Sequence, residues 1–270
     1  MGFPATGYPL PATVFLTHYK LPPQTNNTHL PVRPMSDHIV KSFDDELSQL
    51  NAAIARMGEL SQSQFSAALN ALQRRDAETA ARVIRDDVEV DALERDIEAR
   101  AIRVLALRQP IARDFREVLS TLRIVVELER ICDFSANICK RVIALNKHSP
   151  DEWVNEVGEL GALARKQLAD VVVAFNERNQ EKAITVWACD EQIDDTYTGI
   201  YRRLLDYMKS DPQRVPIGAH FMFIAKNIER IGDHVTNIAE SIYYLVTGNV
   251  LDAPRPKGDK SSLDQIETTT

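Results

Sequence analysis

The sequence is poor in the residues that break helices. It has only ten glycines among 270 residues, and only four of its prolines lie between residues 36 and 250. Ala, Leu, Glu, Arg and Ile, which favour helices, are abundant. No stretch shows the strict alternation of apolar and polar residues that is typical of a half-buried strand. These absences predict an all-α protein built from long helices.

Long apolar runs and cysteine pairs are also missing. The longest apolar runs resemble Val171–Phe175, far below the ~18 residues that cross a bilayer, and no secretory signal opens the chain. Cys132, Cys139 and Cys189 form no C-x-x-C pair, so we expect small buried apolar residues in a reduced, cytoplasmic protein. The net charge of −7 disfavours nucleic acid as a partner. Membrane contact is therefore expected only through other proteins.

Residues 1–35 and 249–270 are polar and lack periodicity, so we expect a disordered N-terminal extension and a disordered tail. Met35 precedes two good helix-capping residues and is interpreted as a candidate translation start. Between these ends, periodicity predicts six helices, at about 38–74, 77–108, 111–146, 150–177, 180–209 and from the Asp211-Pro212 turn to Gly248. Ser149 to Glu152 has the pattern of a capping box, which predicts the start of the fourth helix.

An internal repeat divides the chain in two. The segment Glu129–Asp133 recurs 100 residues later as Glu229–Asp233, and Asn137 recurs as Asn237. Upstream, an Asp pair spaced by four residues recurs with an offset of 103. We therefore predict two tandem three-helix bundles, over residues 36–148 and 149–248.

Each repeat places four acids at matching heights. Acids four residues apart share a helix face, and the two hairpins are centred on Pro110 and on the Asp211-Pro212 turn. The acids of each hairpin are then level with one another. The predicted sets are Asp87, Asp91, Glu129 and Asp133 in the first repeat, and Asp190, Asp194, Glu229 and Asp233 in the second.

Two interpretations of these acids remain open. Four nearby carboxylates repel unless a cation joins them, and their oxygen ligands suit Mg²⁺, Mn²⁺ or Fe, with Zn as a further candidate. Alternatively, the acids form a solvated face and pair with Arg95, Arg130 or Arg230. A carboxylate-bridged di-metal enzyme is the alternative function, but no Glu in the chain is followed by His three residues later.

Several segments together resemble the PhoU family of phosphate-signalling regulators. They are DVEVD, LALRQPIARDF (Leu105–Phe115), ELERICDF and NIERIGDHVTNIAE (Asn227–Glu240). The resemblance covers residues 36–248 and implies two tandem three-helix bundles that form a homodimer. It also implies a non-catalytic accessory protein that contacts the ATPase subunit of the phosphate ABC transporter and a sensor histidine kinase. Such a protein helps to switch off phosphate-starvation genes and so maintains phosphate homeostasis.

The resemblance associates the eight acids with metal ions, but the first repeat departs from the family pattern. It has Cys132-Asp133-Phe134 where the family usually has Gly-Asp-His, whereas the second repeat keeps Gly232-Asp233-His234. A larger residue at 132 is expected to loosen the approach of the helices, so the second set is expected to be the stronger metal site. The side chains of His234, Asn137 and Asn237 are candidates to hydrogen-bond the metal ligands.

Two further groups of residues each allow two interpretations. Arg113, Arg116, Arg130 and Arg230 could meet an acidic partner or phosphate, or form ion pairs on their own helices. The aromatic residues Trp153, Trp187, Phe221 and Phe223 are expected in the core or on a dimer surface.

Overall fold

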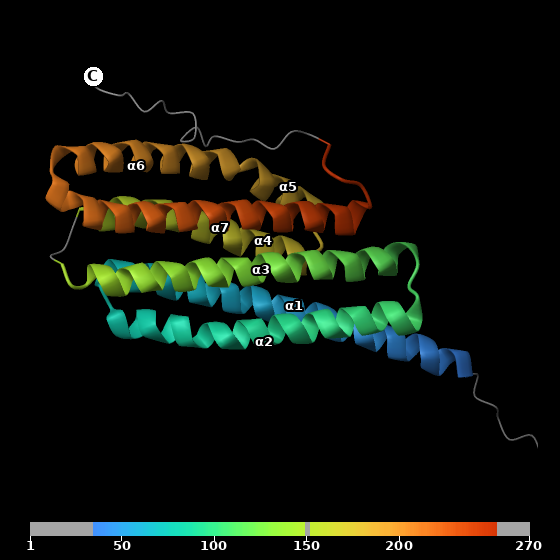
Figure 1. Cartoon of the computed structure of the whole chain (residues 1–270). Helices are drawn as coiled ribbons and strands as arrows, with labels where there is room; N and C mark the ends of the chain where they lie inside the picture. The colour runs from blue at the N-terminus through green and yellow to red at the C-terminus, as the bar shows by residue number, and fades with distance from the viewer. Residues whose placement is uncertain (1–34, 149–151, 253–270) are drawn as a thin grey trace, which may run out of the picture.

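The computed structural model describes residues 35–148 and 152–252, and this part of the chain is helical with no strand. The first repeat forms α1 (Met35–Arg74), α2 (Ala77–Arg108) and α3 (Ala112–Leu145). The second forms α4 (Trp153–Asn176), α5 (Gln180–Ala188), α6 (Asp190–Ser210), the 3₁₀ turn η1 (Pro212–Arg214) and α7 (Val215–Thr247). The helices run alongside one another in two layers, one per repeat (Figure 1). The predicted all-α fold with two similar helical units is confirmed.

The fifth predicted helix is divided in two. The structure ends α5 at Ala188 and begins α6 at Asp190, with Cys189 between them. The hydrophobic pattern does not reveal this break, because the buried residues Val186, Ile193 and Tyr197 keep a helical spacing across it. The division places Asp190 in the first turn of α6.

Parts of the sequence prediction fall outside the described residues. These are the extension before residue 35, the tail beyond residue 252, and Ser149 to Asp151 of the predicted capping box. Glu152 is described, and it stands at the N-cap of α4 without a side-chain capping bond. The spacing predicts Glu152 as the third helical residue of a capping box, and the structure places it before the first helical residue instead.

Matching turns show the duplication in the backbone. Arg75 ends the α1–α2 turn and Arg178 ends the α4–α5 turn, and both have a left-handed conformation, with φ of 57° and 52°. The next residues, Asp76 and Asn179, each accept hydrogen bonds from two backbone N–H groups at the start of the following helix. Such caps satisfy donors that a helix start leaves without partners. The same device therefore starts the second helix of each repeat.

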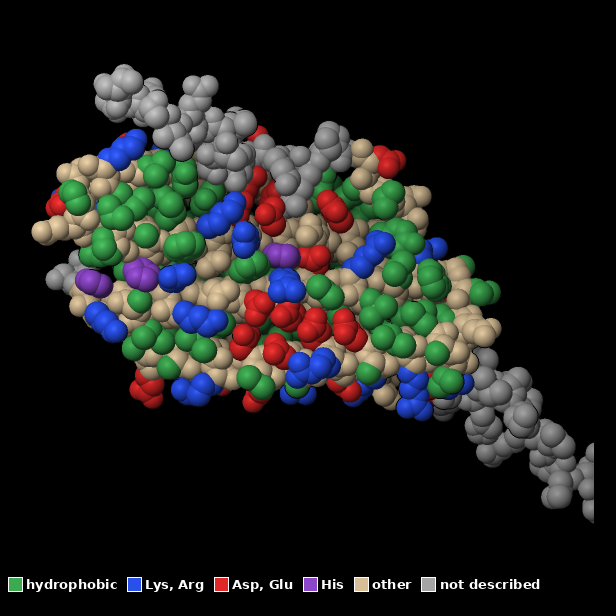
Figure 2. Space-filling model, viewed as in Figure 1, with side chains coloured by type: hydrophobic (Ala, Val, Ile, Leu, Met, Phe, Trp, Pro, Cys, Tyr) green, Lys and Arg blue, Asp and Glu red, His purple; other side chains and the backbone are tan. Residues whose placement is uncertain are grey.

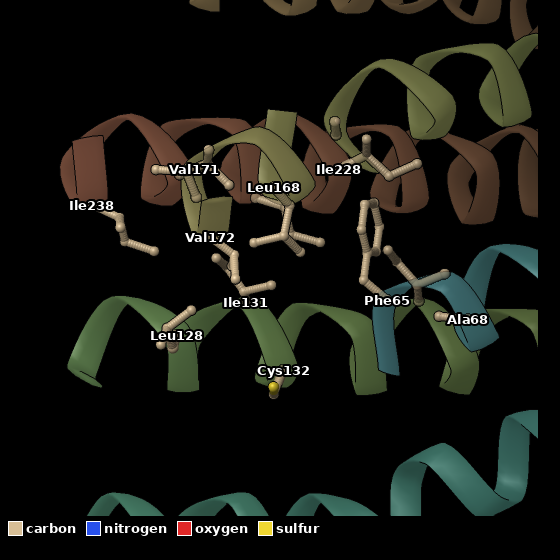
Figure 3. Close-up of a cluster of buried hydrophobic side chains, with 14 of the residues drawn as sticks. Phe65, Ala68, Leu128, Ile131, Cys132, Leu168, Val171, Val172, Ile228 and Ile238 are labelled. Carbon is tan, nitrogen blue, oxygen red and sulfur yellow. The ribbon is translucent and has the colours of Figure 1, made fainter. Parts of the chain in front are cut away.

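The two repeats share one core. α3 packs along α7, and α1 packs against α4. Figure 3 shows Phe65 of α1, Ile131 of α3, Leu168 of α4 and Ile228 of α7 facing this common interior, and all four are fully buried. None of the described helices carries an apolar stretch long enough to cross a bilayer.

Candidate functional site

The four predicted acids of the first repeat meet across the α2–α3 hairpin. Asp87 and Asp91 lie on α2, and Glu129 and Asp133 lie on α3. Burial, followed by the charge of Asp133, raises the pKa of Glu129 to about 7. Burial and the charges of Asp133 and Asp91 raise the pKa of Asp87 to about 6. Figure 2 shows acidic side chains gathered halfway along these helices, where negative charge exceeds what the surroundings neutralise.

A fifth acid, Glu94, joins this group. It lies three residues after Asp91 on α2, and burial together with neighbouring acids raises its pKa. The repeat pattern gave no signal for Glu94, because the second repeat has Tyr197 at the matching position. We call the following residues the first acidic set: Asp87, Asp91, Glu94, Glu129 and Asp133.

Arg130 forms ion pairs with the first acidic set, and Lys140 and Arg95 act on it through their charge. Arg130 Nη1 lies 3.2 Å from Asp133 Oδ2, and Arg130 Nε lies 3.5 Å from Glu129 Oε2. The Arg130 side chain is 53% exposed, and an exposed ion pair contributes little because water screens it. The solvated-face interpretation therefore holds for Arg130, but it leaves Asp87 and Glu129 with raised pKa values.

The acids of the second repeat are more deeply buried and receive hydrogen bonds from other side chains. Glu229 of α7 is 4% exposed, and it accepts a hydrogen bond of 2.7 Å from Lys226 Nζ. Asp190 of α6 is 1% exposed, and Thr236 Oγ1 donates to its Oδ1 at 3.1 Å. We call the following residues the second acidic set: Asp190, Asp194, Glu229 and Asp233.

These carboxylates have the donor chemistry of a metal site without its assembled geometry. Within the described ranges, no group of three or more His, Cys, Asp or Glu side chains converges closely enough to hold a metal ion. Carboxylate oxygens nevertheless suit hard cations, and the raised pKa values of Asp87 and Glu129 indicate a shortage of positive charge. The first acidic set therefore fits a hard cation chemically. Binding one requires its side chains to turn towards a common point.

The three residues expected to support the metal ligands form hydrogen bonds with other side chains. His234 Nδ1 is 2.5 Å from Glu127 Oε2, and Asn237 Nδ2 donates to the same oxygen at 3.1 Å. Because Glu127 belongs to α3, these bonds join the two repeats. Asn137 accepts a hydrogen bond from Lys140 on its own helix. Glu127 was missed because the second repeat has Asn227 at the matching position, so no repeated acid marks it.

Phe134, which stands where the family pattern has His, also packs against the other repeat. Its ring centroid lies 5.4 Å from that of His234, and the Arg230 guanidinium lies 5.7 Å from the Phe134 centroid. These contacts place Phe134 and His234, matched residues of the duplication, against one another.

The cysteine prediction is correct at two positions and wrong at one. Cys132 and Cys139 are buried, and burial raises the pKa of each thiol to about 12. Cys189 is exposed because it lies at the break between α5 and α6. The helical pattern that predicted burial does not anticipate this break.

The aromatic candidates divide between interior and surface. Trp153, Trp187 and Phe221 are buried, and Trp187 Nε1 donates to Glu240 Oε1 at 3.0 Å. Phe223 is 53% exposed, with the Arg141 guanidinium 4.5 Å from its ring centroid.

Comparisons with known proteins agree on one family. The model of the PhoU domain matches residues 54–142 and 157–242. Two relatives are named phosphate-specific transport system accessory protein PhoU homolog. The relative from Xylella fastidiosa strain Temecula1 is 43% identical and the alignment covers 83% of this chain and 93% of that protein. The relative from Caulobacter vibrioides strain NA1000 is 41% identical, with 83% and 98% covered.

Two crystal structures share the fold. PhoU from Pseudomonas aeruginosa superposes with a TM-score of 0.74 at 33% identity, covering 77% of this chain and all of that one. The phosphate transport system regulatory protein PhoU from Streptococcus pneumoniae gives a TM-score of 0.73 at 34% identity, covering 78% and 100%.

Proposed function

The chain belongs to the PhoU family, and from that premise we propose that it is a non-catalytic negative regulator of phosphate uptake and of the phosphate-starvation response. The observation that carries the proposal is the match of the PhoU domain to both repeats. Nearly full-length relatives that are named as accessory proteins of phosphate transport support it.

The proposed mechanism works through protein contacts. The protein, as a homodimer in the cytoplasm, would bind both the ATPase subunit of the phosphate ABC transporter and a sensor histidine kinase. Transport activity would favour one binding mode, and contact with the kinase would then favour the state that represses starvation genes. A partner can shift such an equilibrium only by its difference in affinity for the two states.

A deletion strain tests this function. Without the gene, alkaline phosphatase should be expressed in high phosphate, and a plasmid copy of the gene should restore repression. Pull-downs at high and low phosphate should recover the ATPase subunit and the kinase. Normal repression in the deletion strain at high phosphate would exclude the role.

We further propose that a hard cation, such as Mg²⁺ or Mn²⁺, binds the first acidic set. Asp87, Asp91, Glu129 and Asp133 would supply oxygen ligands, and the cation would relieve their mutual repulsion. Fe and Zn remain candidates for either set. Elemental analysis of protein purified without chelators should show less metal after Asp87→Ala with Asp133→Ala. The pair Glu229→Ala with Asp233→Ala tests the second set in the same way, and unchanged metal content in both variants would refute the proposal.

A further inference from the structure

One end of the first repeat exposes large apolar side chains. We call residues 100–116, which comprise the end of α2, the turn and the start of α3, the α2–α3 tip. Its four exposed large apolar residues are Ile102, Leu107, Ile111 and Phe115, with 59%, 67%, 79% and 44% exposure. Figure 1 shows this end beside the C-terminal part of α7, and Figure 2, in the same view, shows apolar side chains gathered there. Exposed apolar surface of this kind marks an interaction site when its members cluster.

The α2–α3 tip is also basic within an acidic protein. Residues 100–116 contain five arginines and one aspartate, which gives a local net charge of +4 in a chain of net charge −7. Arg108 is already paired with Glu46 at 2.7 Å, and Arg116 lies against the Gly248 cap of α7. Arg103 and Arg113 are exposed and form no ion pair within the described part of the chain, and Arg103 acts on Glu46 only through its charge.

The exposed guanidinium groups of Arg103 and Arg113 flank the apolar side chains. Arg103 precedes Leu107 by four residues on α2, so the two share a helix face. Arg113 lies between Ile111 and Phe115 in the chain. Arginine next to exposed apolar residues is the composition of binding surfaces rather than of a solvated helix end.

The fold itself does not require this surface. The matching end of the second repeat, residues 202–220, also joins two helices in a hairpin, here through η1, and Val215 is its only exposed large apolar residue. Its Lys209 is paired with Asp206, and Arg214 lies over the Tyr207 ring. A helical hairpin of this architecture can therefore end without a group of exposed large apolar side chains.

We propose that the α2–α3 tip docks an acidic segment of a partner protein, with apolar side chains seated on Leu107, Ile111 and Phe115 and carboxylates facing Arg103 and Arg113. The inference rests on the proposed function, because it names the surface through which that function makes a protein contact. An acidic segment complements the positive charge of the tip. Two copies of the tip would repel one another across a two-fold axis. The negative net charge of the whole chain opposes its binding to the extended surface of an anionic bilayer.

The test uses the full-length protein with the purified transporter ATPase subunit and the purified cytoplasmic part of the sensor kinase as probes. The charge variant is Arg103→Glu with Arg113→Glu, and the apolar variant is Leu107→Ser with Ile111→Ser. The matched control in the second repeat is Lys209→Glu with Val215→Ser. All these side chains are exposed, so circular dichroism and the thermal midpoint should match those of the wild type.

Each tip variant should weaken binding of one probe at least ten-fold, while the control binds as the wild type does. Wild-type affinity should fall as NaCl rises from 50 to 300 mM, and the charge variant should lose most of that dependence. Wild-type affinity in the tip variants would overturn the inference and leave the proposed function standing. Failure of the wild type to bind either probe would overturn both.

Three further outcomes would also overturn this assignment. Tip-dependent dimerisation in analytical ultracentrifugation would make a second copy the occupant. Tip-dependent binding to vesicles containing phosphatidylglycerol would make it a membrane surface. If removal of residues 253–270 raised the affinity of each probe only in the wild type, the occupant would be the chain's own end.

Discussion

The two acidic sets occupy matching positions in a duplicated fold, yet their neighbours differ. Lys226 and Thr236, which donate hydrogen bonds to the second acidic set, correspond to Val126 and Ala136 in the first repeat. Neither of those side chains can donate. Tyr197, whose ring centroid lies 4.9 Å from Lys226 Nζ, corresponds to Glu94, a further acid. The second repeat therefore gives Glu229 and Asp190 donors that the first repeat lacks at the matching positions, and the first repeat relies on the exposed Arg130 instead.

This difference teaches that duplication preserved the height of the acids but not their electrostatic environment. In the first repeat, burial and repulsion hold the pKa of Glu129 near 7 and that of Asp87 near 6. In the second, protein donors already supply hydrogen bonds to Glu229 and Asp190. A cation would stabilise the first acidic set more, because the exposed Arg130 leaves the pKa values of Asp87 and Glu129 raised.

The largest expected effect comes from replacing Lys226, the neighbour of Glu229, by the valine that stands at the matching position of the first repeat. Lys226→Val should lower the free energy of unfolding by about 2 kcal/mol, because it removes a charged partner from the buried Glu229. The partial exposure of Lys226 keeps the effect below that of a fully buried pair. Removing the cation that pairs with the first acidic set, by Arg130→Val, should cost less than about 0.5 kcal/mol, because Arg130 is exposed. Urea unfolding measures both, and equal losses would contradict the comparison.

Packing around the acids differs in a compensating way. A Cβ added at Gly232 would lie 3.1 Å from Ile193 Cδ1, whereas the matching Cys132 is fully buried and donates through Sγ to Ser61 Oγ. The residue that matches Ile193 in the first repeat is Val90, which lacks that terminal methyl group. A smaller neighbour thus accompanies the larger residue at 132.

Introducing the first-repeat residue at position 232 without the smaller neighbour should therefore lower the stability of the protein. Gly232→Cys should destabilise the protein by about 1.5 kcal/mol, since crowding against Ile193 outweighs the helix-forming gain over glycine. Adding Ile193→Val should recover part of that loss, giving a favourable coupling of about 1 kcal/mol in a double-mutant cycle measured by urea unfolding. Strictly additive changes would show that the two positions do not compensate each other.

Much of this architecture follows from the sequence alone. The 3.6-residue periodicity locates the long helices. The level spacing around Pro110 predicts Asp87 beside Asp133 and Asp91 beside Glu129, and each of these pairs interacts in the structure. What the sequence cannot supply is the environment of each acid. Three residues near the acids were missed, because each differs from the residue at the matching position of the other repeat. They are Lys226, Thr236 and Glu94, and only the folded structure shows that they lie beside the acids. The break at Cys189 was missed because the buried pattern continues through it.

The smallest effect tests the charge of the first acidic set directly. The pKa values of Asp87 and Glu129 are higher in the folded protein than the ordinary values of 3.8 and 4.5, so the folded state binds protons more tightly than the unfolded state. Chelator-treated wild type should therefore gain stability as the pH falls from 8 through about 7 and 6, and the gain should be complete only below the ordinary pKa of 3.8 for Asp87. Asp87→Asn with Glu129→Gln removes the penalty at high pH. It should stabilise the metal-free protein by on the order of 1 kcal/mol at pH 8, after allowance for solvent screening.

The same pair of substitutions in the second repeat should act with the opposite sign. Asp190→Asn with Glu229→Gln weakens acceptors that Thr236 and Lys226 already use, so the protein should lose stability at pH 8. Urea unfolding of the wild type and both variants at pH 8 and pH 5 separates the two environments. The first-repeat variant should approach the wild type at pH 5, because Asp87 and Glu129 are then largely protonated in the folded protein. An advantage over the wild type that persists undiminished at pH 5 would mean that the substitutions stabilise by packing, and that the first acidic set does not hold the unneutralised charge that sets it apart from the second.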